Sequence, residues 1–258
     1  MKKLLGFMVL AAVVVWAGAA QAGWVLVENR EGDLQTSYIQ GNVFRFEEPS
    51  GQSVLIDLNQ GRMYFLNELS NCYWSGTAEE FESEVKASYR VQMEKMLAHA
   101  PEDQRSALRA ALEIRAPGLT AAEGRASIEV RATSARAEIA GYLTQKHEVW
   151  VDGRLEGEVW LAEKVGAAQE IDPVAMGRFL AALYSADQRR GFAYAPEVTA
   201  LYGRGWPLRI VEYGEDGQVH VTQTSRIEEK PLPESMFKVA RGSARVSLLE
   251  LLDAATGS

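Results

Sequence analysis

Residues 53–67, SVLIDLNQGRMYFLN, raise the question that decides the fold. Two apolar runs flank residues 59–61 (NQG), which predicts a β-hairpin whose turn ends on a glycine in the left-handed region. In that register we expect Ile56 to face Tyr64. Apolar side chains then stand on both faces of the hairpin, whereas a hairpin at a protein surface is apolar on one face only. Something must therefore cover the second face.

The first 22 residues indicate export. Lys2 and Lys3 precede an apolar run from Leu4 to Ala20, and Ala20 and Ala22 are small residues at the two positions that a signal peptidase reads. We therefore expect residues 1–22 to be a signal peptide, cleaved after Ala22, and the protein to be periplasmic. The alternative is an uncleaved anchor helix, but the run is shorter than the roughly 20 residues that span a bilayer comfortably.

Composition narrows the classes of partner. The chain has 258 residues and a formal net charge of −8, so an acidic surface argues against nucleic acid and against direct docking on anionic lipid heads. No segment after the signal peptide has the length and hydropathy of a transmembrane helix. The single cysteine, Cys72, cannot form an internal disulfide. We expect it to be a small buried residue rather than a reactive thiol.

Strand-like sequence up to residue 74 gives way to helical periodicity at Thr77. Residues 77–80 (TAEE) form a capping box, and apolar residues then recur every three or four positions, which predicts a long amphipathic helix. Pro101 interrupts this pattern and suits the first turn of a second helix. The sequence therefore predicts a helical insert over residues 78–115.

Strand patterns return in the second half of the chain. Asp152-Gly153 is a strong two-residue hairpin signal between two apolar runs, and residues 208–225 give a further hairpin. Asp172-Pro173 starts a short helix, and residues 189–206 are expected to form a loop. After residue 240 the tail carries one short apolar stripe, Val246, Leu249 and Leu252, which is compatible with a helix or with a loose tail.

This order of strands, helices, strands, helix and strands predicts one α+β domain built on a large antiparallel sheet. Two arrangements would cover the second face of the opening hairpin. The interior is either packed with the chain's own side chains, or the sheet is curved and its apolar inner face lies under helices that act as a lid. The pattern alone does not separate a filled core from a ligand-sized cavity, because burial drives both by roughly 25 cal/mol per Å².

Five further segments extend the pattern of the opening hairpin: CYWSGTAEEF (72–81), MEKMLAHAPEDQRSALRAAL (93–112), GYLTQKHEVWVDGRLEGEVWLA (141–162), GRGWPLRIVEY (203–213) and KPLPESMFKV (230–239). In this order they resemble segments of exported proteins of unknown function with a fold like the bacterial lipoprotein carrier LolA and receptor LolB. The resemblance covers most of residues 24–240.

The resemblance implies a large curved antiparallel β-sheet, an open half-barrel, with an inserted helical lid. Residues 23–240 would form this LolA-like domain, with the insert at 78–115, and residues 241–258 would be a C-terminal tail. In the carrier, the apolar concave surface shelters acyl chains during transfer across the periplasm. No cysteine stands at the signal-peptide exit, so we do not expect the lipid attachment that the LolB receptor carries, and the resemblance then implies a soluble form.

No pattern for catalysis, a metal or a cofactor emerges from the sequence. His99, His147 and His220 do not have metal-ligand spacing, and there is no nucleophile elbow. Asp57 stands among apolar residues, and we expect a strand-end aspartate that accepts turn amides rather than a buried functional carboxylate. An enzyme is therefore not expected, although a cleft with Asp57 beside His147 or His220 would reopen that possibility.

We therefore predict a soluble periplasmic, non-enzymatic protein that binds or carries a hydrophobic ligand, either an acyl chain or a lipoprotein-like group. Its partner would be a lipid or an acylated protein, or another envelope protein. The alternative is a cell-envelope structural or protein-interaction module with a filled core and no ligand. The candidate cavity residues are Leu55, Phe65, Trp74, Met93, Met96, Trp150 and Trp160.

Overall fold

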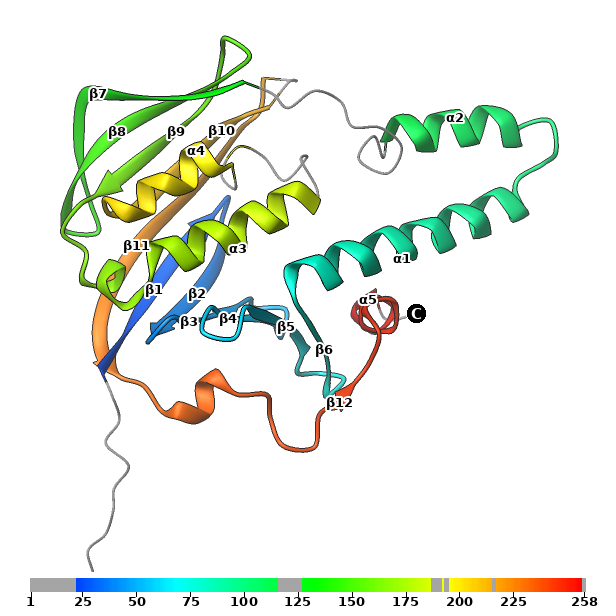
Figure 1. Cartoon of the computed structure of the whole chain (residues 1–258), viewed down its shortest axis with the longest axis horizontal. Coiled ribbons are helices and arrows are strands. Elements are labelled where there is room, and N and C mark those ends of the chain that lie inside the picture. Colours follow the sequence, from blue (N-terminus) through cyan, green and yellow to red (C-terminus); the bar gives the residue numbers. More distant parts are fainter. Residues whose placement is uncertain (1–21, 116–126, 187–191, 193–194, 215–216, 257–258) are drawn as a thin grey trace, which may run out of the picture.

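The computed structural model describes residues 22–115, 127–186, 192, 195–214 and 217–256. Twelve strands form one sheet in the order β12-β6-β5-β4-β3-β2-β1-β11-β10-β9-β8-β7, and every neighbouring pair is antiparallel except β12 with β6 (Figure 1). The strands are β1 (Ala22–Arg30), β2 (Asp33–Gln40), β3 (Val43–Glu47), β4 (Gln52–Asp57), β5 (Arg62–Asn67), β6 (Cys72–Gly76), β7 (Ile128–Ile139), β8 (Tyr142–Val151), β9 (Arg154–Ala162), β10 (Trp206–Tyr213), β11 (Val219–Pro231) and β12 (Ala244–Arg245).

Five α-helices accompany the sheet in the described residues: α1 (Ala78–His99), α2 (Arg105–Arg115), α3 (Pro173–Ala186), α4 (Pro196–Thr199) and α5 (Leu248–Thr256). None of them is long and apolar enough to cross a membrane. The predicted signal peptide lies outside the described residues, apart from Ala22 at the start of β1. Its cleavage stays a prediction.

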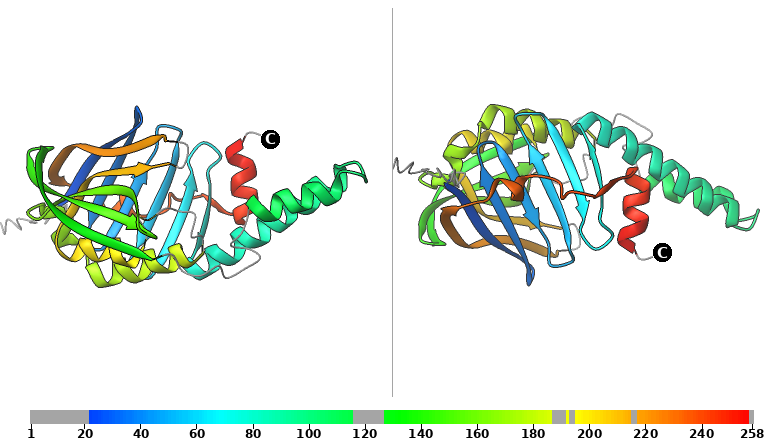
Figure 2. Two further views of the ribbon diagram at one scale, coloured as in Figure 1. Left: turned by 90° about the horizontal axis from the view of Figure 1, so that it is seen from above. Right: turned by 90° about the horizontal axis from the view of Figure 1, so that it is seen from below.

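The sheet is open and curved, and α3 lies in its hollow (Figures 1 and 2). As the sequence indicates, Asp172 caps this helix, because its Oδ1 accepts hydrogen bonds from the backbone N–H groups of Val174 and Ala175. An apolar stripe then faces the sheet and is buried: Met176, Phe179, Leu180 and Leu183. The predicted α+β half-barrel is therefore confirmed, with its own helix filling the centre of the hollow.

The helical insert reaches the sheet with its first turns only. Thr77 and Glu80 form the predicted capping box, in which each side chain accepts the other residue's backbone N–H. Ala78 and Phe81 are the buried residues of α1, and from there the helix runs outward to α2 (Figure 1). The lid is therefore anchored at one end and projects beyond the sheet.

The register predicted for the opening hairpin is wrong by one residue. Ile56 pairs with Met63 rather than Tyr64, because the connection is a four-residue turn, 58–61, that includes Leu58. Leu58 is not paired with any residue of β5, and its side chain is buried in the core. A one-residue slip moves every side chain of one strand to the other face. Met63 and Phe65 therefore share the concave face with Ile56.

The outer face of this hairpin region is covered by the chain's own C-terminal segment. After β11 ends at Pro231, the chain crosses beneath β1–β5 towards α5 (Figure 2, right). Leu232 is buried there, and a Cβ on Gly23 would come within 2.6 Å of it, so the glycine permits the close approach. Arg45 also holds the crossing, since its guanidinium donates to the Met236 carbonyl oxygen at 3.0 Å.

One segment differs from the sequence-based expectations. Part of the predicted loop 189–206 forms α4 and a following 3₁₀ turn at Ala200–Gly203, which bury apolar residues against the sheet. The tail beyond residue 240, for which the sequence left a helix and a loose tail open, forms β12 and the helix α5. β7 and β8 form a long hairpin, with Ala140 and Gly141 at positive φ in its turn.

Leu232→Ala tests the crossing segment. Removal of this buried side chain leaves a cavity beside β1, so we expect the free energy of unfolding to fall by about 2–5 kcal/mol in urea titrations. Leu69→Ala is the matched control: Leu69 is 84% exposed, and its loss is expected to change stability by about 0.5 kcal/mol or less. Equal effects of the two substitutions would contradict a buried crossing segment.

Candidate functional site: an apolar pocket with a polar rim

The concave face is organised into ladders, because residues directly opposite each other on neighbouring strands share a face. The deepest ladder across β1 to β5 is apolar: Trp24, Ile39, Phe44, Ile56 and Met63. The next ladder, from β1 to β6, is apolar except for one serine: Leu26, Ser37, Phe46, Val54, Phe65 and Trp74.

The third ladder is entirely polar and forms the outer margin of the concave face. Thr224, Glu28 and Gln35 are paired from β11 to β2. Glu48, Gln52 and Asn67 continue the same margin: Glu48 directly follows β3 and its N–H donates to the Gln52 carbonyl oxygen, and Gln52 pairs with Asn67. We call this ladder the polar rim. The concave face thus changes from apolar to polar along the strands, which is the arrangement that an amphipathic ligand requires.

A pocket of about 290 Å³ opens between the second ladder, α1 and α5. Its size is at the lower end of the roughly 300–1,000 Å³ of small-molecule sites. Its apolar walls are Phe46, Val54, Phe65 and Leu66 of the sheet, Phe81 and Val85 of α1, and Leu248, Leu251 and Leu252 of α5. Its polar lining is Ser53 and four members of the polar rim: Gln35, Glu48, Gln52 and Asn67.

Three aromatic rings form one end of the pocket wall. The ring centroids of Phe65 and Phe81 lie 5.2 Å apart, and Trp74 lies behind both, 5.8 Å from Phe65 and 5.7 Å from Phe81. Trp74 is almost fully buried and sits against Gly76, where an added Cβ would come within 2.6 Å of the indole. The cluster therefore fixes the first turn of α1 on β5 and β6 and makes this wall rigid.

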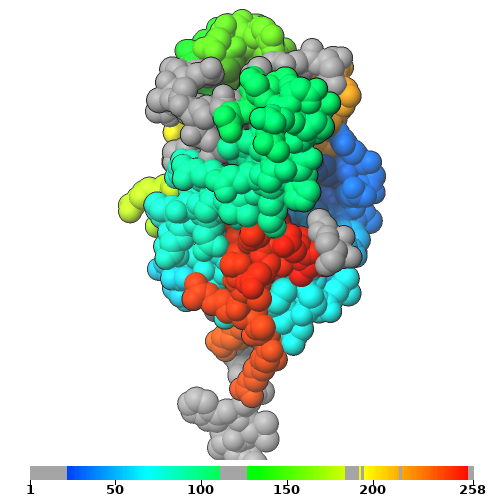
Figure 3. All heavy atoms as spheres, turned by 90° about the vertical axis from the view of Figure 1, so that its right-hand side faces the viewer, coloured from blue at the N-terminus to red at the C-terminus, as the bar shows by residue number. Residues whose placement is uncertain are grey.

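The opposite wall, α5, is held by hydrogen bonds to α1 and β6. Ser247 and Glu250 form a capping box, and the Leu248 N–H donates to Glu84 of α1 at 3.1 Å. Arg245 donates to the Ser75 carbonyl oxygen. Figure 3 shows α5 lying beside α1 at this end of the molecule.

Glu28 of the polar rim has an unusual environment. Ser37 Oγ donates to its Oε2 at 3.1 Å. Burial raises the pKa of the Glu28 carboxyl, and the neighbouring Ser37 and Thr224 hydroxyls oppose this rise only in part. Among the residues that the structure describes, no cation contributes to this pKa. The negative charge of Glu28 is therefore poorly compensated.

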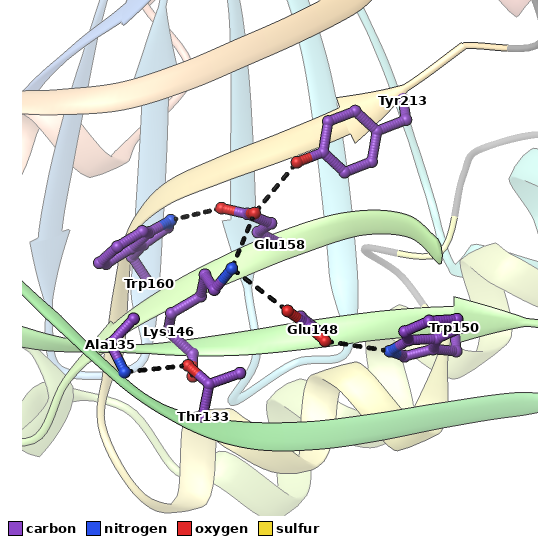
Figure 4. A network of polar contacts seen from close by, with 8 residues as sticks. All are labelled: Thr133, Ala135, Lys146, Glu148, Trp150, Glu158, Trp160 and Tyr213. Atoms are coloured by element: carbon purple, nitrogen blue, oxygen red, sulfur yellow. Dashed lines mark hydrogen bonds and ion pairs between the residues drawn. The ribbon is translucent and has the colours of Figure 1, made fainter. Parts of the chain in front are cut away.

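The outer face of β8 to β10 carries a separate polar network (Figure 4). Glu148-Val-Trp150 and Glu158-Val-Trp160 repeat the same triplet on β8 and β9, and each indole N–H donates to the glutamate two residues before it. Lys146 Nζ lies between the two carboxylates, 3.2 Å from Glu148 and 3.1 Å from Glu158.

Each polar group of this network finds a partner within it. Burial disfavours the charge on Glu158, but hydrogen bonds from Lys146, Trp160 and Tyr213 outweigh burial and lower the pKa of the Glu158 carboxyl. The guanidinium of Arg131 lies 4.5 Å from the centre of the Trp150 ring, and that of Arg209 lies 5.4 Å from the Trp160 ring. The network is thus internally satisfied, which fits a wetted outer face of the sheet.

Two of the seven candidate cavity residues lie at the pocket, and five lie elsewhere in the structure. Phe65 lines the pocket and Trp74 supports it from behind. The other five lie elsewhere: Leu55 on the outer face opposite Arg45 and Tyr64, Met93 and Met96 farther along α1, and Trp150 and Trp160 in the outer network. None of these five lines the pocket, and whether any of the seven binds a ligand stays a prediction.

Sequence reasoning missed the α5 wall. The stripe singled out in the tail, Val246, Leu249 and Leu252, has the wrong phase, because the buried residues of the helix are Leu248 and Leu251. The signal that could have found it is the capping box at Ser247 and Glu250. This box places the helix start at Leu248 and thereby sets which residues face the core.

The residues considered for catalysis lie in separate places. Asp57 Oδ1 accepts the backbone N–H groups of Asn59 and Gln60, as expected for a strand-end aspartate. His147 is buried on β8, where burial lowers the pKa of its imidazole, whereas His220 pairs with Glu31 on the surface. Among the described residues, no three His, Cys, Asp or Glu side chains are grouped to hold a metal ion. Cys72 is buried, as expected.

No family model matches this chain, and no curated protein matches it. Among solved structures, PNGF-II aligns with a TM-score of 0.40 and 12% identity over 92% of this chain and 33% of that one. The Pseudomonas aeruginosa MucA/MucB complex aligns with a TM-score of 0.36 and 12% identity over 86% and 56%, and MucB alone with 0.31 and 14% over 88% and 60%. The chain thus spans between a third and three-fifths of these chains. Because the TM-scores are so low, the site is interpreted from its own residues.

Glu28→Gln tests the polar rim. A carboxyl whose pKa is raised in the folded state stabilises the fold fully below its unfolded pKa of about 4.3, and this contribution is lost as the pH rises through the folded pKa. We therefore expect Glu28→Gln to be more stable than the wild type at pH 7.5, with the advantage disappearing near pH 4. Urea titrations at both values measure this, and exposed Glu229→Gln on β11 is the control, for which no such pH-dependent gain is expected.

Lys146→Met tests the outer network. Without the ammonium group, Glu148 and Glu158 lose their shared cation, so we expect the free energy of unfolding to fall by about 1–3 kcal/mol at pH 7. The loss should shrink towards pH 3, because stability from a carboxyl with a lowered pKa is present above its unfolded pKa and disappears as the pH falls. Adding Glu158→Gln should recover part of the loss. A loss that is the same at both pH values would argue against the ion pairs as its source.

Proposed function

We propose that this protein is a non-enzymatic binding protein of the cell envelope, and that its ligand is an apolar chain of the acyl type held in the pocket between the sheet, α1 and α5. The observation that carries the proposal is the pocket itself. It has an apolar interior of about 290 Å³ and opens at a polar rim on one side. The predicted signal peptide supports the envelope location.

The size of the pocket limits the ligand. The deepest ladder of the concave face is covered by α3, so a ligand has access to the region beside α1 and α5 and not to the whole hollow. A single chain of medium length fits this space better than a lipid with several acyl chains. Its burial against the aromatic wall would supply the free energy of binding, at roughly 25 cal/mol per Å² of apolar surface.

The mouth of the pocket contains a residue suited to a test. Leu252 lines the pocket yet is 45% exposed, so it stands at the opening and not in the folding core. A larger side chain at this position would block the entrance with little effect on stability. Ala254 is an exposed residue of the same helix that does not line the pocket, and it provides the matched position.

We expect purified protein, prepared without detergent, to bind 1-decanol in isothermal titration calorimetry. Leu252→Trp should weaken this binding at least about tenfold, which corresponds to about 1.4 kcal/mol, because the indole occupies the entrance. Ala254→Trp should change the affinity by less than about twofold. Native mass spectrometry of the same preparations should show a ligand that decanol displaces from the wild type.

Two results would count against the proposal. If decanol does not bind and no displaceable ligand copurifies, the pocket is not a ligand site. If Leu252→Trp and Ala254→Trp have the same effect, binding takes place elsewhere. Thermal unfolding of both variants serves as the check that each is folded.

A second candidate function is an envelope protein-interaction module with a filled core. The observation that favours it is α3, whose apolar stripe already occupies the centre of the half-barrel. The projecting α1–α2 arm, with Val91 and Met96 exposed on α1, would then be the contact surface. Failure of decanol to bind, together with loss of a partner on Met96→Lys, would support this function over the first.

A further inference from the structure

The charge of the ligand's head group can be inferred from the polar rim, on the basis of the proposed function. The rim meets the pocket at Gln35, Glu48, Gln52 and Asn67. Among the described residues that line the pocket, none is basic. A carboxylate or phosphate at the mouth would therefore find no cation to pair with, and anionic head groups are normally bound by Arg or Lys.

Two basic residues close to the pocket are engaged elsewhere. Lys86, which follows the lining residue Val85 on α1, is paired with Glu82. Arg45 on β3 points to the outer face, where it contacts Glu47, Glu68 and the carbonyl oxygen of Met236 in the crossing segment.

One carboxylate of the rim, in contrast, lines the opening. Glu48 is exposed at the mouth, and Glu28 is two strands away on the same rim. Neighbouring strands are about 4.8 Å apart, so two strand spacings place the backbones of Glu28 and Glu48 roughly 10 Å from each other. Burial disfavours the charged form of Glu28, so exposed Glu48 is the main source of negative potential at the mouth.

The hydrogen-bonding character of the rim points the same way. Carboxylates accept hydrogen bonds, and the amide groups of Gln35 and Gln52 can both accept and donate. A head group with hydroxyl or amide N–H donors is complementary to this set. An anionic head group offers acceptors and meets carboxylates.

We propose that the pocket selects a single acyl chain whose head group carries no negative charge and donates hydrogen bonds, as in a monoacylglycerol or an N-acyl amide. Free fatty acids and acyl phosphates bind more weakly, because the rim repels their negative charge. The selection resides in Glu48 above all, because Glu48 lines the mouth itself.

The test compares two probes with the same chain, 1-decanoylglycerol and decanoate, by isothermal titration calorimetry at pH 7.5 and low salt. We expect the wild type to bind decanoylglycerol at least about tenfold more tightly. Glu48→Lys should strengthen decanoate binding about tenfold and change decanoylglycerol binding by less than about twofold, because a cation at the mouth pairs with the carboxylate. High salt should reduce both effects on decanoate.

Glu102→Lys is the matched control, since Glu102 is exposed between α1 and α2 and does not line the pocket. It makes the same change in net charge and should leave both affinities unchanged. If the wild type binds both probes equally, or decanoate more tightly, the charge selection is overturned while the apolar pocket stands as a binding site. If Glu102→Lys acts like Glu48→Lys, a local role of the rim is overturned. If neither probe binds, the proposed function fails and this inference fails with it.

Discussion

The pairing of β1 with β11 is the constraint on which the rest of the structure depends. It joins the N-terminal strands, β1 to β6, to the strands β7 to β11 of the second half, and so makes one sheet out of two. The paired residues are about 200 positions apart in the chain, as in Ala22 with Pro231. Closing so long a loop costs conformational entropy before the contacts form, so burial on both faces has to stabilise the seam.

Both faces of the sheet near this seam are indeed covered, and by different means. On the concave side, α3 fills the hollow with Met176, Phe179, Leu180 and Leu183. On the outer side, the chain that leaves β11 turns back under β1 to β5 and buries Leu232. β11, which forms the seam, is therefore followed directly in the chain by the segment that covers the outer face. Because both faces are covered in this way, the opening hairpin can be apolar on both faces without a second sheet.

The candidate site lies between the part of the concave face that α3 covers and the part that α1 and α5 cover. The stripe of α3 covers the deepest apolar ladder, while α1 and α5 stand over the second ladder at the far end of the sheet. The space left between them is the pocket. The polar rim follows immediately, so apolar interior and acidic margin are set by successive positions on the same strands. The second ladder would contact the apolar chain of a ligand, and the polar rim would contact its head group.

The outer network around Lys146 shows that not every cluster of aromatic and charged residues is a binding site. Its indole N–H groups, carboxylates and ammonium are hydrogen-bonded to one another. The pocket differs because no basic residue stands beside Glu48 among the described residues that line it. The outer network and the pocket contain similar types of residue, but they differ in whether their carboxylates are paired with cations.

The sequence by itself determined the local elements and the class of fold. The capping box at Thr77, the Asp172 cap and the Asp152-Gly153 turn each act within a few residues, so their physics is contained in short stretches. The order of strands and inserted helices indicated an α+β domain on a large antiparallel sheet, whereas the curvature of that sheet was implied by the family resemblance alone. Only the tertiary structure decided the register of the opening hairpin, since the burial of Leu58 in the core outweighs the turn signal. It also decided which residues meet at the pocket. Phe65 and Phe81 meet Leu251, which lies more than 160 residues later in the chain, and no local pattern records that a sheet, an insert and a tail converge on the same space.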